Sequence, residues 1–348
     1  MDKGHLTMLQ LDIDCSPEEL SLKSFFVGPQ AENKEILYNE ISMVLDHWID
    51  WRRDFCPNDG FAISGDDQSN PAFQKKIQEM RTHTQSLLDT FSKEIPKFSP
   101  RYLGHMFSEI SLPSIIGHLI ALLHNPNNIS KESSRVGINI EKEAIRYLSQ
   151  MVGYSENSLG HFTSGGTVAN FEAVIRAKKK LTNNILKHNE RDIGFNEACY
   201  IFDTNKLPTK NDLSDIEIYK YISHKYKLDF EGFTLLVPDS KHYSWTKSAS
   251  IFGVGAKNLT LVSLNKHGQI CTSDLQKKIN SCLVKKIPMI CITSVLGTTE
   301  LGTVDAIDKI TEVISSYKTQ YGFDFWHHID AAYGGFFTCL KDGNILKQ

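Results

Sequence analysis

The stretch FDFWHHIDAAYGG, residues 323–335, joins an apolar run to a single carboxylate, Asp330, at its end. A buried carboxylate is costly unless a hydrogen-bond donor or an opposite charge meets it. Two alanines and two glycines follow Asp330 within five residues, so the neighbouring side chains are small. The pattern predicts a buried strand whose carboxylate meets a partner, either elsewhere in the chain or in a ligand.

Four other β-rich runs precede this strand, at residues 198–202, 233–238, 259–264 and 288–294. They are apolar throughout rather than alternating, which is typical of parallel strands covered on both faces. Helical patterns separate several of them, at residues 246–253, 273–284 and 305–318. We therefore predict an α/β fold for residues 101–348, with a mostly parallel sheet and helices on both faces.

The first hundred residues follow a different pattern. Apolar positions recur at helical spacing over residues 32–52 and 74–94. Turn and breaker residues fill 56–71, which is predicted to be a loop. Because these amphipathic helices have no clear core of their own, we predict that residues 1–100 form a dimerisation segment that packs on a second subunit.

Composition excludes several classes of partner. A net charge of -3 over 348 residues gives no reason to expect a nucleic-acid partner. No apolar run is long enough to span a membrane, and the first residues lack the apolar core of a secretion signal. The seven cysteines include no CxxC pair and no zinc-ligand spacing, so we expect reduced thiols, no metal site and a cytoplasmic location.

A turn-rich segment, Ser164 to Thr167, opens a strong helical pattern. Glycine lets the backbone approach a ligand closely, and the free N–H groups of a helix N-terminus suit a phosphate. Gly166 and Thr167 are thus candidate phosphate-binding residues. The segment is neither GxxxxGK[ST] nor GxGxxG, and taken alone it also fits an ordinary capped helix.

Two further loops follow predicted strands. His242 comes shortly after the strand that ends near Val237, and Gly297-Thr298-Thr299 follows the strand that ends near Ser294. A single loop histidine is most often an ordinary surface residue. In a parallel sheet, however, the carboxyl ends of the strands meet at one edge, where ligands bind. We therefore expect both loops to converge with Asp330 and the Gly166 turn.

Pyridoxal 5'-phosphate matches this set of side chains. Its phosphate would bind at Gly166 and Thr167, and its ring face would contact the imidazole of His242. Asp330 would pair with the pyridine nitrogen, since a carboxylate favours the protonated, charged ring. Ala332 would leave room for the ring. A protonated ring is the stronger electron sink.

On these residues the sequence resembles the group II pyridoxal-phosphate-dependent amino acid decarboxylases. Four motifs carry the resemblance in the family's order: TSGGTVAN, KHYSWTKSASIFGVG, LGTTELGTVDAID and HIDAAYGG. The N-terminal segments FFVGPQAENKE, DHWIDWRRDFCP and FSPRYLGHM are most similar to bacterial tyrosine decarboxylases. The resemblance runs from about Phe25 to Gly335.

The resemblance implies a fold-type-I large domain, a homodimer and a lyase of amino acid and carboxylic acid metabolism. It implies that the cofactor is held by Gly166, Thr167, His242, Thr299, Asp330 and Ala332. His242 and Asp330 would also serve catalysis, His242 by assisting proton transfer. His105, within RYLGHM, matches a segment that lines the substrate pocket. The implied substrate is an aromatic L-amino acid such as tyrosine, with glutamate as the alternative.

One departure from the family is large. The family's Schiff-base lysine lies some tens of residues beyond the aspartate, and this chain ends at Gln348. Lys341 and Lys347 are too close to Asp330 to match it, and the C-terminal small domain is also absent. We therefore expect a truncated chain that is inactive alone and binds the cofactor weakly at most. The alternatives are a non-catalytic remnant, a subunit completed by another polypeptide, or a lyase acting on phosphorylated sphingoid bases.

Overall fold

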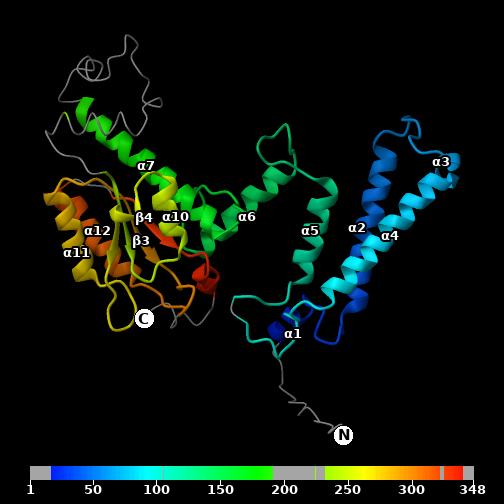
Figure 1. Ribbon diagram of the computed structural model, residues 1–348, viewed down its shortest axis with the longest axis horizontal. Helices are drawn as coiled ribbons and strands as arrows, with labels where there is room; N and C mark the ends of the chain where they lie inside the picture. The colour runs from blue at the N-terminus through cyan, green and yellow to red at the C-terminus, as the bar shows by residue number, and fades with distance from the viewer. Residues whose placement is uncertain (1–16, 105, 191–223, 225–231, 322–324, 340–348) are drawn as a thin grey trace, which may run out of the picture. The chain divides into compact units, whose positions relative to one another are not determined.

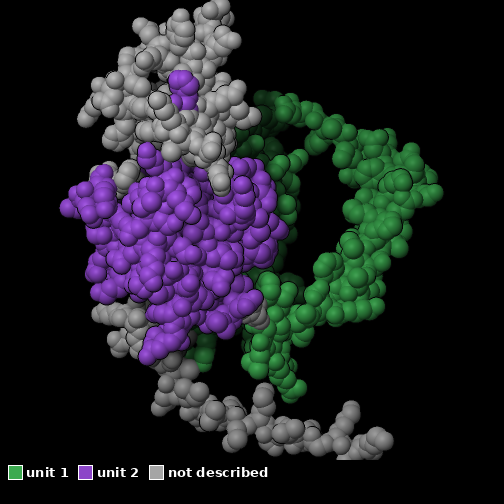
Figure 2. All heavy atoms as spheres, turned by 60° about the vertical axis from the view of Figure 1, so that its left-hand side comes forward, with its two compact units in different colours: residues 1–138 green, residues 139–348 purple. Residues whose placement is uncertain are grey.

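The computed structural model describes residues 17–104, 106–190, 224, 232–321 and 325–339 (Figure 1). The predicted strand at 198–202, together with His105, Lys341 and Lys347, lies outside the described residues. The chain divides into two compact units, residues 1–138 and 139–348 (Figure 2). The division predicted from the sequence, a helical dimerisation segment over residues 1–100 and a cofactor-binding large domain over residues 101–348, stays a prediction.

The second unit is built on a four-stranded sheet in which every neighbouring pair is parallel. Its strands are β1 (Thr234–Pro238), β2 (Leu259–Val262), β3 (Met289–Val295) and β4 (His327–Asp330), in the order β2-β1-β3-β4. Four of the five runs predicted from the sequence thus form the sheet, and the parallel arrangement is confirmed. Asp330 is the last residue of β4, as predicted.

Helices connect and cover these strands. The second unit contains α6 (Gly137–Met151), α7 (Gly166–Glu190), α10 (Ser244–Ile251), α11 (Thr272–Val284) and α12 (Ile307–Tyr321), with short 3-10 turns η1 (Ala256–Asn258) and η2 (Gly334–Cys339). Figure 1 shows α11 and α12 on one side of the sheet and α10 on the other. Helices therefore cover both faces, as predicted.

Two apolar clusters fill the spaces between the sheet and its helices. Alternate residues of β1 point to opposite faces: Leu235 and Val237 join one cluster, and Leu236 joins the other. The first cluster includes Val174 of α7 and Trp245 of α10, and the second is formed largely by α11 and α12. Both β1 and β3 are buried along their whole length, which explains their continuous apolar sequences.

The first unit is helical, with α1 (Pro17–Lys23), α2 (Lys34–Phe55), α3 (Gly65–Ser69), α4 (Pro71–Phe91) and α5 (Leu112–His124). Helices α2 and α4 confirm the two helical patterns seen in the sequence. The predicted loop at 56–71 is wrong in part, because Ser64 and Asp67 form a capping box that begins α3.

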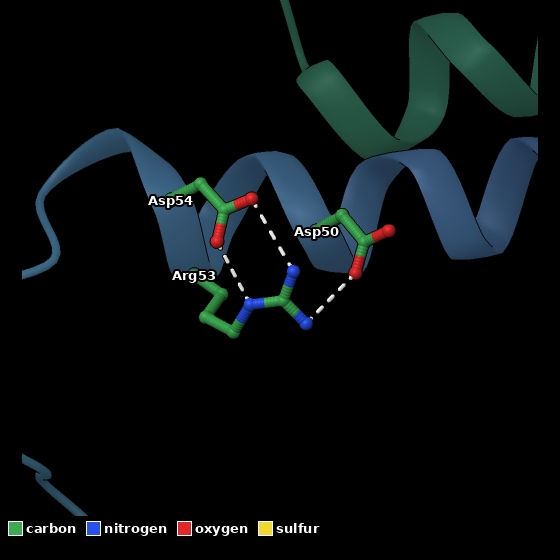
Figure 3. A network of polar contacts seen from close by, with 3 residues as sticks. All are labelled: Asp50, Arg53 and Asp54. Atoms are coloured by element: carbon green, nitrogen blue, oxygen red, sulfur yellow. Dashed lines mark hydrogen bonds and ion pairs between the residues drawn. The ribbon is translucent and has the colours of Figure 1, made fainter.

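This unit buries few apolar side chains. Val44 and Leu112 are the buried hydrophobic residues among those described, and no described residue of α4 is buried. Near the end of α2, Arg53 pairs with Asp50 at 2.9 Å and with Asp54 at 2.8 Å (Figure 3). These pairs are solvent-exposed, and exposed ion pairs stabilise a fold only weakly. Among the described residues, no helix is long and apolar enough to cross a membrane.

Candidate active site

At the carboxyl edge of the sheet, the connections that leave two neighbouring strands turn toward opposite faces. The connection that leaves β1 runs through α10 on one face, and the connection that leaves β3 runs through α12 on the other. β1 and β3 are hydrogen-bonded neighbours in the sheet. Neighbouring strands whose connections leave toward opposite faces open a crevice at their carboxyl ends, where ligands bind in α/β proteins.

The turn before α7 reaches the residues that follow β4. A Cβ added to Gly166 would lie 2.6 Å from the Cβ of Ala332, so only glycine fits there without movement. The N–H groups of Gly166, Thr167 and Val168 have no acceptor among the described residues. Three unpaired amides thus begin a long helix beside the end of β4, an arrangement that suits an anion.

Asp330 is buried, with 7% of its surface exposed. Its Oδ2 accepts hydrogen bonds from Asn170 Nδ2 at 2.8 Å and from Trp245 Nε1 at 3.3 Å. Among the described residues, its Oδ1 accepts one hydrogen bond, a 3.3 Å bond from the Ala332 N–H. Within the described ranges Asp330 forms no ion pair, so its carboxylate is held by neutral donors.

His242 lies half-buried in the loop after β1, as predicted. Its Nδ1 is 2.9 Å from Ser244 Oγ, and the Ser244 N–H lies 3.3 Å from the same nitrogen. Ser244 is fully buried and also accepts a 3.0 Å hydrogen bond from Asn170 Nδ2. Asn170 therefore connects the loop after β1 with the carboxylate at the end of β4.

Two histidines of β4 lie beside this group. His328 Nε2 is 2.9 Å from Asn170 Oδ1, and its ring packs edge-on against Trp245 at 5.3 Å. Burial lowers the pKa of His328, while the nearby Asp330 acts in the opposite direction. Burial also lowers the pKa of His327 to about 4, and His328 adds to that shift. Ser294 Oγ lies 2.8 Å from His327 Nε2.

The loop after β3 closely approaches the loop after β4, and the shortest approaches are between backbone atoms. Gly297 adopts a φ of +85°, and a Cβ on it would lie 2.9 Å from the Cα of Gly334. A Cβ on Gly334 would overlap the carbonyl oxygen of Leu296. Thr298 is buried, and Thr299, the predicted cofactor neighbour, is half-buried beside it. The loop that carries Thr299 is thereby fixed against the residues that follow Asp330.

These features fit the predicted cofactor. Gly166, Thr167, His242, Asp330 and Ala332 all lie at the carboxyl edge of the sheet or at the helix start beside it. Oδ1 of the buried carboxylate has one long hydrogen bond from the residues that the structure describes, so it can accept a further donor such as a ring N–H. In the part of the chain that the structure describes, no three His, Cys, Asp or Glu side chains gather as metal ligands do.

Four residues of this site were not singled out from the sequence: Asn170, Ser244, Trp245 and His328. The hydrogen bonds that place them in the site join residues 74 to 160 positions apart in the sequence. The exception is the bond between Ser244 and His242, which are two positions apart. One usable signal exists, since Asn170 lies four residues after Gly166 and so on the same helix face.

A parallel α/β sheet with a buried carboxylate and a helix start with unpaired amides at its carboxyl edge is an arrangement that suits a cofactor of the pyridoxal-phosphate class. Residues 232–346 match the pyridoxal-dependent decarboxylase conserved domain. This match supports the group II pyridoxal-phosphate-dependent decarboxylase family for this chain, and the cofactor of that family is pyridoxal 5'-phosphate.

Relatives match along most of this chain. The L-tyrosine decarboxylase of Levilactobacillus brevis is 31% identical over 337 residues, which cover 93% of this chain and 53% of the relative. The L-tyrosine decarboxylase of Enterococcus faecalis is 28% identical, over 94% of this chain and 54% of the relative. The chain thus spans about half the length of these curated relatives.

Solved structures agree on the fold. The glutamate decarboxylase domain of a Vibrio parahaemolyticus protein, described as diaminobutyrate-pyruvate transaminase and L-2,4-diaminobutyrate decarboxylase, superposes with a TM-score of 0.56. It is 19% identical, over 95% of this chain and 65% of that one. Mouse CSAD gives a TM-score of 0.51 at 22% identity, over 72% of this chain and 44% of that one. The fold-type-I prediction is confirmed.

Proposed function

We propose that the site binds pyridoxal 5'-phosphate and that the protein is a carboxy-lyase acting on an L-amino acid. The observation that carries this proposal is the contact between the Gly166 turn and the end of β4. It brings a helix start with unpaired N–H groups close to a buried carboxylate, which is linked to His242 by hydrogen bonds. When bound, the cofactor supplies an electron sink for the carbon that loses carbon dioxide.

The chain's own residues have separate tasks in this proposal. Gly166 and Thr167 bind the phosphate through backbone N–H groups and a hydroxyl. Asp330 accepts a hydrogen bond from the ring N–H and stabilises the positive charge that the ring then carries. His242 contacts the ring face and holds a proton near the reacting carbon. Ala332 and Thr299 shape the space around the ring, and His105 is proposed to line the substrate pocket.

We propose tyrosine as the first substrate to test. The two tyrosine decarboxylases described above, at 31% and 28% identity, support this choice. Glutamate remains the alternative substrate. The proposed cytoplasmic location continues to rest on cysteine spacing alone.

The test is an assay of carbon dioxide release by the protein expressed from its full reading frame. It is run with pyridoxal phosphate and a panel of tyrosine, phenylalanine, tryptophan, glutamate and aspartate. We expect the highest kcat/KM for tyrosine. Faster turnover of glutamate would reverse the substrate assignment. No turnover of any amino acid, with the cofactor bound, would overturn the decarboxylase proposal and favour the non-catalytic alternative.

We also propose that the first unit pairs with a second copy of the chain. Large apolar side chains are exposed along α2 and α4, among them Tyr38, Trp51, Phe55, Leu88 and Phe91. Exposed apolar side chains in this number are typical of a surface that another chain covers. Light scattering should give twice the monomer mass, and Leu88→Lys should lower it, whereas the control Gln85→Lys on the same helix should not. A wild-type monomer at concentrations well above micromolar would contradict this.

A further inference from the structure

A continuous chain of hydrogen bonds joins the carboxylate of Asp330 to the ring of His242. It runs from Asp330 Oδ2 to Asn170 Nδ2 at 2.8 Å, from Asn170 Nδ2 to Ser244 Oγ at 3.0 Å, and from Ser244 Oγ to His242 Nδ1 at 2.9 Å. The two central residues, Asn170 and Ser244, are buried, with 3% and 0% of their surface exposed. Asp330 and His242, at the two ends of this series of hydrogen bonds, are both proposed to contact the cofactor. We call the series, with Asn170 and Ser244 between them, the relay.

The direction of each hydrogen bond follows from the chemistry of the groups. An ionised carboxylate only accepts, so the amide nitrogen of Asn170, not its oxygen, must face Asp330. The second N–H of that amide then points to Ser244 Oγ. The amide oxygen is left facing His328 Nε2, 2.9 Å away, so His328 Nε2 must carry a proton and donate it.

The same reasoning fixes the proton on Ser244. Its oxygen already accepts from Asn170, and within the described residues the one acceptor beside its hydroxyl is His242 Nδ1. The Ser244 backbone N–H also points to Nδ1, at 3.3 Å. Because two donors converge on Nδ1, this nitrogen must be unprotonated. The neutral ring of His242 therefore carries its proton on Nε2.

We propose that Asn170 and Ser244 are positioning residues that hold His242 in the Nε2–H form, with Nε2 as the atom that exchanges a proton during the reaction. The part of this proposal that concerns reaction rests on the proposed function. The proton placement itself does not, because it follows from the chain's own side chains. Through this relay, Asp330, which is proposed to meet the cofactor ring, also determines which nitrogen of His242 carries the proton.

Ser248 provides a matched control. It lies one turn after Ser244 on α10 and is equally buried, yet its hydroxyl has no hydrogen-bond partner within the described residues. A serine-to-alanine change at either position removes the same atom from the same helix. Only the change at Ser244 breaks the relay.

The test is nitrogen NMR of the cofactor-free chain labelled with ¹⁵N-histidine, at about pH 8, where an ordinary histidine is neutral. The His242 signals are assigned from their loss in His242→Gln. We expect a protonated Nε2 and an unprotonated Nδ1 in the wild type. Ser244→Ala removes the 2.9 Å donor and leaves only the 3.3 Å backbone N–H at Nδ1, so the share of the Nδ1–H tautomer should rise. Asn170→Ala frees the Ser244 hydroxyl to turn and should give a smaller rise, and Ser248→Ala should match the wild type. A wild-type ring protonated on Nδ1, or an unchanged ring in Ser244→Ala, would overturn the relay.

A second measurement separates this proposal from the proposed function. In the active protein, Ser244→Ala should lower kcat about tenfold to a hundredfold, as expected when a proton-transfer group loses its orientation, while KM changes little. Equal kcat values for Ser244→Ala and Ser248→Ala would overturn the catalytic part. If the wild type decarboxylates nothing, the proposed function fails, and the NMR result still decides the proton placement on His242.

Discussion

Asn170 Nδ2 donates a 2.8 Å hydrogen bond to Asp330 Oδ2 across 160 residues of sequence. Asn170 lies one helical turn after Gly166, on the same face of α7. That face therefore meets the end of β4 at two points, since Gly166 also packs against Ala332. The distance between the proposed phosphate site and the proposed ring carboxylate is thus set by one rigid helix.

Asp330→Asn should weaken cofactor binding while changing the stability of the fold little. The amide oxygen can still accept from Asn170 and Trp245, and the new NH2 group displaces only the long 3.3 Å bond from the Ala332 N–H, so we expect the free energy of unfolding to change by about 1 kcal/mol. The negative charge is lost, so pyridoxal phosphate should bind at least about tenfold more weakly, since charge-assisted hydrogen bonds are roughly twice as strong as neutral ones. Quenching of tryptophan fluorescence measures binding, because one of the four indoles, Trp245, contacts Asp330. Unchanged affinity would contradict the proposed role.

Gly166→Ala should strain the contact between α7 and the end of β4. The new methyl group would lie 2.6 Å from the Cβ of Ala332, and overpacking of this kind costs about 1–3 kcal/mol. We expect a lower melting temperature and weaker cofactor binding. The double variant Gly166→Ala with Ala332→Gly removes the opposing methyl group and should recover most of the stability. A double variant no more stable than the single one would show that the two residues do not meet.

Asp305→Asn should destabilise the second unit. Each carboxylate oxygen accepts a 2.7 Å hydrogen bond from a backbone N–H, Oδ1 from Ile270 and Oδ2 from Val295. An amide has only one acceptor oxygen, so one buried N–H would face an NH2 group, at a cost of about 1–3 kcal/mol. Urea unfolding measures this cost. Asp308→Asn, on an exposed carboxylate nearby, is the control and should unfold like the wild type.

The sequence predicted the sheet because its strands are buried on both faces, which leaves a continuous apolar pattern. It also predicted the convergence of His242 and Asp330, because the carboxyl ends of parallel strands meet at one edge. The relay through Asn170 could not be predicted, since an asparagine inside a helical pattern gives no sign of a partner 160 residues away. The short helix α3 was missed because turn-forming residues also form capping boxes. The roles assigned to Thr299 and His105 stay predictions.

His327→Gln should reduce the loss of stability in acid. The folded-state pKa of His327 is about 4, below the ordinary value of 6.5, so the unfolded chain takes up a proton first as the pH falls. Stability linked to this residue is therefore fully present above about pH 6.5 and declines as the pH falls toward 4. Between about pH 7.5 and pH 5 the loss should be about 2 kcal/mol, at about 1.4 kcal/mol for each pH unit below 6.5.

Urea unfolding of the cofactor-free chain at both pH values measures this dependence. Glutamine can keep a hydrogen bond to Ser294, so we expect similar stability to the wild type at the higher pH and a smaller decline at the lower one. His267→Gln, at an exposed position, is the control and should decline as the wild type does. An equal decline in the wild type and in His327→Gln would show that His327 takes up its proton as readily in the folded chain as in the unfolded one.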